Sequence, residues 1–222
     1  MTDDSPLPDP PFDREPKFRR RAEARPDEVL DAALQLFTAQ GFARTTVEQV
    51  ARQAGLSKAA VYLYFPSKKA VLAGLVHRAV GSVADQALAR IADYKGDPRP
   101  AMREFVNRIA TGMADPKAFA VPKLVMREAV AAPEIARLYR DEVLDKVIPV
   151  LSALIGQGVA GGYIRHVDPE LTVRSLIGPV LIHILLAEIF AVQPEDGLSL
   201  DRLIDNHLSI LCAGLEPTEG GR

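Results

Sequence analysis

The chain has 222 residues, of which 48% are hydrophobic and 25% are charged. These proportions are ordinary for a folded globular protein of one or two domains, so they exclude a wholly disordered or collagen-like chain. A single cysteine, Cys212, excludes an intrachain disulfide and leaves no ligand set for a Cys-based zinc site. The net charge of −2 conceals an uneven distribution, because basic side chains concentrate in residues 14–25.

The first 25 residues are expected to form a disordered basic arm. They are rich in proline and poor in large apolar side chains, so they cannot bury enough surface to fold. They also lack the apolar stretch of a signal peptide, and the chain is expected to be cytoplasmic. Two interpretations of Arg19, Arg20 and Arg21 stay open. They form either a solvated tail or an arm that follows the DNA backbone or enters the minor groove.

Residues 26–76 are expected to form a compact helical domain. Apolar residues at helical spacing indicate a first helix that begins at Pro26 and ends at Gly41. Thr45 and Glu48 then form a capping-box pattern, in which the Thr hydroxyl accepts from the backbone three residues on and the Glu reaches back. This pattern predicts the start of a second, short helix.

Two short helices joined by a tight turn are predicted over residues 46–54 and 57–64, and Ser67 caps a longer helix after them. That arrangement is a helix-turn-helix, whose second helix enters the DNA major groove. At 100° per residue, Val61 and Phe65 face the core. The outward face of the same helix carries Lys58, Ala59, Tyr62 and Leu63. A capped pair of short helices also occurs as plain core packing, which is the alternative interpretation.

The run Gly41–Leu72 resembles the DNA-binding domain of the TetR/AcrR family of repressors. It contains a Thr pair, an Ala-Gly turn, a Ser cap and a Tyr-x-Tyr-Phe ending. The resemblance is strong over residues 27–75 and only architectural beyond them. One departure is Ala59, which stands where many members have Gly and limits how closely the backbone approaches DNA. The resemblance implies operator DNA as a partner, contacted by Thr45, Thr46, Ser57, Lys58, Ala59, Tyr62, Tyr64 and Lys68.

Residues 77–222 are expected to form a larger helical domain. Apolar periodicity predicts its helices at about 100–114, 117–131, 133–160, 168–192 and 199–214. The histidines lie far apart, and none has a second His or Cys at the spacing of a helical metal site. The sequence has neither a Gly-rich phosphate loop nor a Gly-x-Ser-x-Gly elbow. No enzyme activity, cofactor or metal is therefore expected.

Two strongly apolar helices near the C-terminus are expected to need partners on more than one side. The resemblance implies that these last two long helices pair with their copies in a homodimer, whereas the alternative is a larger monomeric core. The residues expected at the dimer interface are Leu181, Ile184, Leu200, Leu203, Ile204 and Leu208.

A ligand pocket is expected inside the same domain, because bulky flexible side chains and a lone histidine occur at helical spacing. Such residues are also common in an ordinary core, and that alternative stays open. The candidate lining residues are Met102, Phe105, Ile109, Met113, Phe119, Met126, Tyr139 and His183.

The sequence therefore predicts an all-α protein with an N-terminal helix-turn-helix DNA-binding domain and a larger C-terminal helical domain. We expect a regulator that binds a palindromic operator as a homodimer and is released by a small hydrophobic effector. The alternative is a DNA-binding regulator without a small-molecule ligand, which is constitutive or controlled by a protein partner. No membrane partner is expected, because the longest apolar stretch, Leu176–Leu186, is short for a spanning helix.

Overall fold

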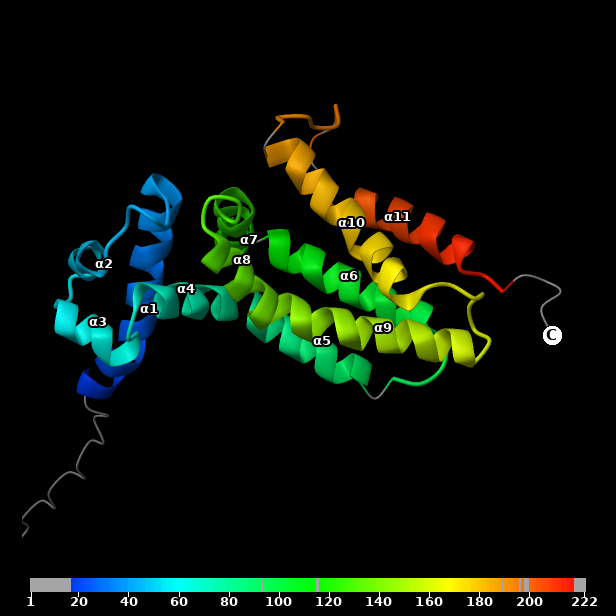
Figure 1. Ribbon diagram of the computed structural model, residues 1–222, viewed down its shortest axis with the longest axis horizontal. Coiled ribbons are helices and arrows are strands. Elements are labelled where there is room, and N and C mark those ends of the chain that lie inside the picture. The colour runs from blue at the N-terminus through cyan, green and yellow to red at the C-terminus, as the bar shows by residue number, and fades with distance from the viewer. Residues whose placement is uncertain are drawn as a thin grey trace, which may run out of the picture.

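The computed structural model describes residues 17–92, 94–114, 116–188, 190–195, 197 and 200–217, without the side chains of 17–25, 82–84, 87, 92, 113–114, 116–118 and 188. Every regular element in these residues is a helix, so the all-α prediction is confirmed (Figure 1). A small helical unit at one end of the molecule joins a larger helical body through a single connecting helix.

The small unit comprises α1 (Lys17–Gln40), α2 (Val47–Gln53), α3 (Lys58–Tyr64) and α4 (Lys68–Val76). Its core is built from the apolar faces of these helices, with Phe37, Val61 and Leu72 almost fully buried. Because the helices are short and amphipathic, their mutual packing supplies most of the stability that they lack as isolated segments.

The first helix begins at Lys17, nine residues before the expected start, so residues 17–25 are helical and do not belong to a disordered arm. They consist mainly of Arg, Lys, Ala and Glu, which favour helix, and Pro26 is accommodated inside α1. Residues 1–16, the rest of the expected arm, lie outside the described residues.

The connecting helix α4 continues into η1 (His77–Gly81), a wide π-helical turn, and then into α5 (Ser82–Ala92). A π turn places one extra residue in the helical repeat and thereby rotates the side chains that follow it. A second such turn, η2 (Arg140–Leu144), lies between α8 (Pro133–Tyr139) and α9 (Asp145–Ala160). Both turns lie in the body, where η1 contacts η2.

The rest of the body consists of α6 (Pro98–Ala114), α7 (Pro116–Glu128), α10 (Pro169–Glu188) and α11 (Leu200–Gly214). The bounds agree with the expected helices to within a few residues, except that α10 ends before the predicted residue 192. In the body, α10 packs against α6, α9 and α11.

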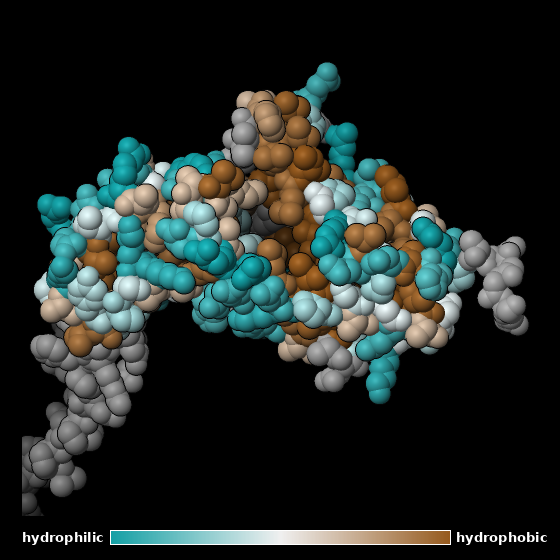
Figure 2. Space-filling model, in the orientation of Figure 1, coloured by the Kyte–Doolittle hydropathy of each residue, from teal (hydrophilic) through white to brown (hydrophobic). Residues whose placement is uncertain are grey.

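The apolar helices of the body are longer than the stretch singled out in the sequence. Residues 133–160 and 169–187 are each long and apolar enough, by composition, to cross a membrane. Here they pack against each other and against the other body helices, with about a third of each apolar window buried. The remaining apolar side chains leave a hydrophobic surface over α10, which appears as a brown area around a hollow in Figure 2.

Candidate nucleic-acid interface and apolar cavity

Helix α2 begins one residue later than the sequence pattern suggested. Thr46 is its N-cap, in an extended conformation, and its hydroxyl accepts from the backbone N–H of Gln49 at 3.2 Å. The Gln49 side chain in turn accepts from the Thr46 N–H at 2.8 Å, which completes a capping box. The expected box between Thr45 and Glu48 is therefore wrong by one residue.

Thr45 is only 1% exposed and cannot act as the DNA contact that was expected of it. Its hydroxyl donates to the Gly41 carbonyl at 2.8 Å and accepts from the Gln40 side chain at 3.1 Å. These bonds tie the loop before α2 to the end of α1. Thr45 therefore positions α2, and only Thr46 of the pair is exposed to solvent.

Helix α3 presents its side chains as the 100° periodicity predicted. Ser57 caps the helix by accepting from the Ala60 N–H, and Val61 is fully buried. The outward residues Lys58, Ala59, Tyr62 and Leu63 are exposed, and Leu63 reaches 84% exposure. An exposed face with a cation, an aromatic hydroxyl and an apolar tip suits contact with phosphates and base edges.

Lys58 lies between two neighbours on this face. Its ammonium forms an ion pair with Glu48 and lies 5.7 Å from the centroid of the Tyr62 ring. The hydrogen bond with Glu48 raises the pKa of Lys58, and its counterpart lowers the pKa of Glu48. Because both side chains are half-exposed, this pair is weak and readily exchanged for a phosphate or a base.

Lys68, at the start of α4, turns inward and not toward the solvent where a phosphate would lie. Its ammonium donates to the carbonyls of Phe42 at 2.8 Å and Ala43 at 3.2 Å. The same group lies 4.4 Å from the centroid of the Phe42 ring. Desolvation by burial lowers the pKa of Lys68. The expected DNA contact is thus replaced by a bond that holds the loop between α1 and α2.

The body contains an apolar cavity of about 650 Å³, a size typical of ligand sites. Four of the expected residues line it. They are Phe105, Ile109, Met126 and Tyr139. The rest of the wall comes from residues that the sequence did not single out as lining residues, on both π turns, on α9 and α10 and on the helices α6 to α8. They include Ala79, Val80, Val143, Leu144, Val147, Ile177, Gly178, Leu181 and Leu185.

Three of the other expected lining residues do not reach the cavity. Met102 is fully buried in the contacts of α6 with its neighbours, and Phe119 packs against the core from α7. His183 is half-buried with its Nε2 atom enclosed, but the cavity wall is formed by the residues on either side of it. The Met113 side chain lies outside the described residues.

The cavity wall carries two polar side chains, Arg108 and Tyr139. The Arg108 guanidinium donates to the Glu104 carboxylate at 3.0 and 3.1 Å, and this bond lowers the pKa of Glu104. Burial raises the pKa of Tyr139, so its hydroxyl stays protonated and is a donor at neutral pH. An otherwise apolar wall with two polar groups suits a mainly hydrophobic ligand.

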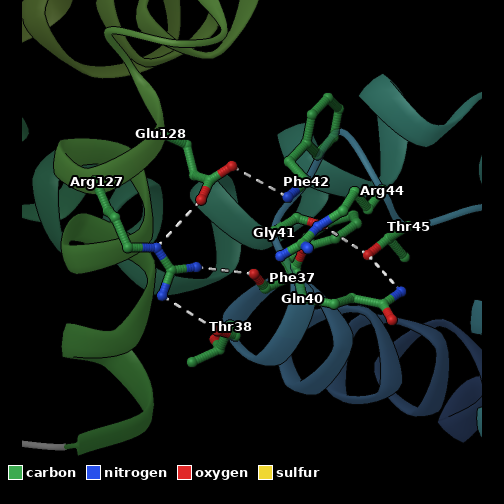
Figure 3. A network of polar contacts seen from close by, with 9 residues as sticks. All are labelled: Phe37, Thr38, Gln40, Gly41, Phe42, Arg44, Thr45, Arg127 and Glu128. Carbon is green, nitrogen blue, oxygen red and sulfur yellow. Dashed lines mark hydrogen bonds and ion pairs between the residues drawn. The ribbon is translucent and has the colours of Figure 1, made fainter.

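The body contacts the small unit through the C-terminal end of α7 (Figure 3). Arg127 donates to two of the last carbonyls of α1, those of Thr38 at 3.1 Å and Phe37 at 3.0 Å. These carbonyls lie at the negative end of the helix dipole, where a cation is favourable. Glu128 pairs with Arg127 and accepts from the Phe42 N–H at 3.2 Å.

Two successive parts of the chain match the sequence models of known protein families. Residues 29–75 match "Bacterial regulatory proteins, tetR family", and residues 91–205 match "Tetracyclin repressor-like, C-terminal domain". The second match alone spans just over half of the chain. The chain belongs to the TetR family.

A similar relative of this TetR-family chain is the transcriptional regulator RutR of Escherichia coli O157:H7. It is 31% identical over 215 residues, which cover 90% of this chain and 95% of RutR. Members of the family are transcriptional regulators and not enzymes, and this protein is a DNA-binding transcriptional regulator of the same family.

Solved structures share the fold. The SmeT–triclosan complex has a TM-score of 0.70 at 24% identity and covers 89% of this chain and 93% of its own. FadR from Bacillus subtilis in complex with stearoyl-CoA has a TM-score of 0.69 at 19% identity, with coverages of 86% and 99%. TetR-family regulators bind DNA operators, dimerise and bind small molecules.

The expected dimer surface of this TetR-family chain needs correction. Ile184, Ile204 and Leu208 are buried within the protomer, where they join the core between α10, α11 and their neighbours. Leu200 and Leu203 are half-buried, and Leu181 is half-exposed. The sequence reasoning missed other apolar side chains that lie on the surface of these helices, which are Leu171, Ile182, Leu186 and Ile210.

Proposed function

We propose that the protein is a cytoplasmic repressor that binds a palindromic operator as a homodimer and leaves it when a small hydrophobic effector occupies the body. In this proposal, residues 26–76 act as the DNA-binding domain and residues 77–222 as the effector-binding and dimerisation domain. The observation that carries it is the apolar cavity, whose walls include α7, the helix that holds the end of α1.

The proposed DNA contacts lie on the exposed side of the helix-turn-helix. Lys58, Ala59 and Tyr62 approach base edges from α3, and Leu63 supplies an apolar contact of the kind that thymine methyl groups make. Phosphates are contacted by side chains at the helix starts and on the flank of α3. These are Thr46, Ser57 and Tyr64.

A homodimer is supported by the exposed apolar side chains of the last two long helices. Leu171 on α10 and Ile210 on α11 are each more than half exposed and do not line the cavity. Leu181 and Ile182 are half exposed on α10 and also line the cavity. Exposed apolar patches of this kind mark protein interfaces, and an isologous pairing of one patch with its copy gives a two-fold dimer. Such a dimer places two α3 helices about 34–36 Å apart, or a multiple of it, on successive half-sites.

The effector is proposed to be mainly apolar with one polar group. The walls offer few polar partners, and Tyr139 and Arg108 are placed to bind the polar end. The alternative, a regulator without a small-molecule ligand, predicts a filled body with no reason for a cavity of about 650 Å³. The cavity therefore favours ligand release.

The test begins with selection of operators from random-sequence DNA by the purified full-length protein. A palindromic consensus protected at one dimer per site is the expected result. A panel of hydrophobic small molecules is then screened for release of that operator, measured by fluorescence anisotropy. Absence of any selected sequence contradicts the DNA-binding part of the proposal, and a monomer at micromolar concentration by sedimentation contradicts the dimer.

A further inference from the structure

The backbone of a single residue in the loop between α1 and α2 is held from two sides. The N–H of Phe42 donates to Glu128 Oε2 at 3.2 Å, and the carbonyl of the same residue accepts from Lys68 Nζ at 2.8 Å. The Phe42 ring is buried and packs edge-on against Phe37, with 5.1 Å between the ring centroids. This loop leads directly into α2, so its orientation fixes that of the helix-turn-helix.

Of the two groups that hold Phe42, Glu128 comes from a helix that lines the cavity, and Lys68 comes from a helix that continues into the cavity wall. Val125 and Met126 on α7 and Ala129 directly after it line the cavity, and at 100° per residue they fall within about 100° of arc. Arg127 and Glu128 lie on the other side of the same turn and contact α1 and its loop (Figure 3).

Lys68, the second group that holds Phe42, is also linked to the cavity wall through its helix. Lys68 begins α4, and α4 runs without a break into η1, where Ala79 and Val80 line the cavity. A shift of either wall on ligand binding is therefore carried to the same loop by a rigid helix. Packed helices respond as units because protein interiors are close-packed.

We propose that Glu128 and Lys68 are positioning residues that clamp the Phe42 backbone in the orientation that binds the operator, and that cavity occupancy acts on DNA through this clamp. The clamp itself requires only DNA binding, whereas its response to a ligand rests on the proposed effector function. Neither residue touches DNA in this scheme.

The sign of the expected effect separates this proposal from simple electrostatics. Glu128 is a negative charge close to a surface that binds a polyanion, so its removal alone would strengthen DNA binding. Loss of a positioning residue weakens binding instead. Because the phosphate contacts themselves are kept, the dependence of affinity on salt stays the same.

The experiment compares Glu128→Ala, Glu128→Gln and Lys68→Met with the wild type, using the full-length protein and its selected operator at 50–200 mM salt. Glu170→Ala is the control for loss of a carboxylate that pairs with an arginine, since Glu170 lies 2.8 Å from Arg174 on an exposed surface of α10. Hydrogen exchange over residues 37–46 and the melting temperature are measured in parallel.

We expect Glu128→Ala and Lys68→Met to bind the operator about tenfold more weakly at every salt concentration, with faster exchange in residues 37–46. Their salt slopes should match that of the wild type. Glu128→Gln should recover most of the affinity, because an amide oxygen still accepts from the Phe42 N–H. Glu170→Ala should bind like the wild type.

Unchanged or tighter binding by Glu128→Ala would overturn the clamp, as would an equal loss in the Glu170 control. If the salt dependence of operator affinity falls by about one in Lys68→Met, Lys68 contacts a DNA phosphate. If Glu128→Ala melts below the assay temperature, the proposal is tested with Glu128→Gln and Lys68→Met. Wild-type operator affinity in Lys68→Met also refutes the proposal.

The ligand response is tested with the fluorescent apolar anion 8-anilinonaphthalene-1-sulfonate. Gly178→Phe, which places a ring in the cavity, must weaken its binding for the cavity to be the site. Because coupling is reciprocal, saturating operator should lower the dye affinity of the wild type several-fold. In Glu128→Ala this ratio should approach one.

Persistence of the ratio in Glu128→Ala would show that the signal bypasses the clamp. A ratio of one in the wild type, or no binding of the dye, would instead count against the effector function and leave the clamp to be judged by operator affinity.

Discussion

The hydrogen bond between Glu128 and the Phe42 N–H can be tested by adding a methyl group at Gly41. Gly55 is the control, because its backbone conformation is similar. Gly41 and Gly55 both lie in the left-handed region, with φ of +86° and +67°. A Cβ atom at Gly41 would lie 3.3 Å from Glu128 Oε2, whereas one at Gly55 would have no heavy atom within 4 Å. Alanine at the two positions therefore differs mainly in the approach to Glu128.

Gly55→Ala should cost about 1 kcal/mol in the free energy of unfolding, because a residue with a Cβ is strained in the left-handed region. Gly41→Ala carries the same strain and also pushes the carboxylate from the Phe42 N–H, which loses a hydrogen bond worth about 1.5 kcal/mol. We expect a total of about 2–3 kcal/mol for Gly41→Ala.

The assay is urea unfolding of the full-length protein, with each alanine also placed in a Glu128→Ala background. In that background the extra cost at Gly41 should vanish, while the cost at Gly55 should not change. Equal losses at the two glycines, or an extra cost that survives without Glu128, would refute the reasoning.

Other predictions concern the operator face, the cavity, the N-terminal segment and the dimer. Lys58→Ala should relax base preference at one position of each half-site, seen by repeating the operator selection, while a uniform loss across sequences would make Lys58 a phosphate contact. Gly178→Phe should lose release of the operator by hydrophobic compounds; release at wild-type concentrations would place the effector elsewhere. Alanine at Arg19, Arg20 and Arg21 should keep the melting temperature and weaken binding most at low salt, and equal affinity there would make the segment a solvated one. Ile210→Glu should dissociate the dimer in sedimentation, and Val130→Glu, at the more exposed Val130, should not; a dimeric Ile210→Glu would exclude this face.

The sequence predicted the helix-turn-helix well because its signals are local. Periodicity within α3 placed Val61 inside and Lys58, Tyr62 and Leu63 outside, as the structure has them. The capping box was misplaced by one residue since both members of the Thr pair are chemically able to cap. Their roles are set by tertiary burial, which hides Thr45 under the end of α1.

Features that depend on distant partners were not predictable in this way. The carbonyls that hold Lys68 lie 25 and 26 residues before it in the chain, and no spacing rule connects them. The cavity walls at η1 and η2 depend on π turns, which rotate side chains away from the regular 100° pattern. Helix α10 is apolar nearly all round, so its sequence does not tell Ile184, which is buried, from Ile182, which is exposed.

Because the cavity is separate from α3, an effector must bind one state of the protein more tightly than the other in order to act on DNA binding. In the proposed mechanism the effector does not touch DNA, so it would release the operator only by its difference in affinity for the two orientations of the loop at Phe42. A shift from 1% to 99% of the released state requires a difference of about 5.5 kcal/mol. Coupling between two sites is commonly 1–3 kcal/mol for one ligand, and a two-fold dimer with one cavity in each protomer can add two such contributions. The proposed dimer would therefore supply the paired half-sites and also much of the coupling that efficient release demands.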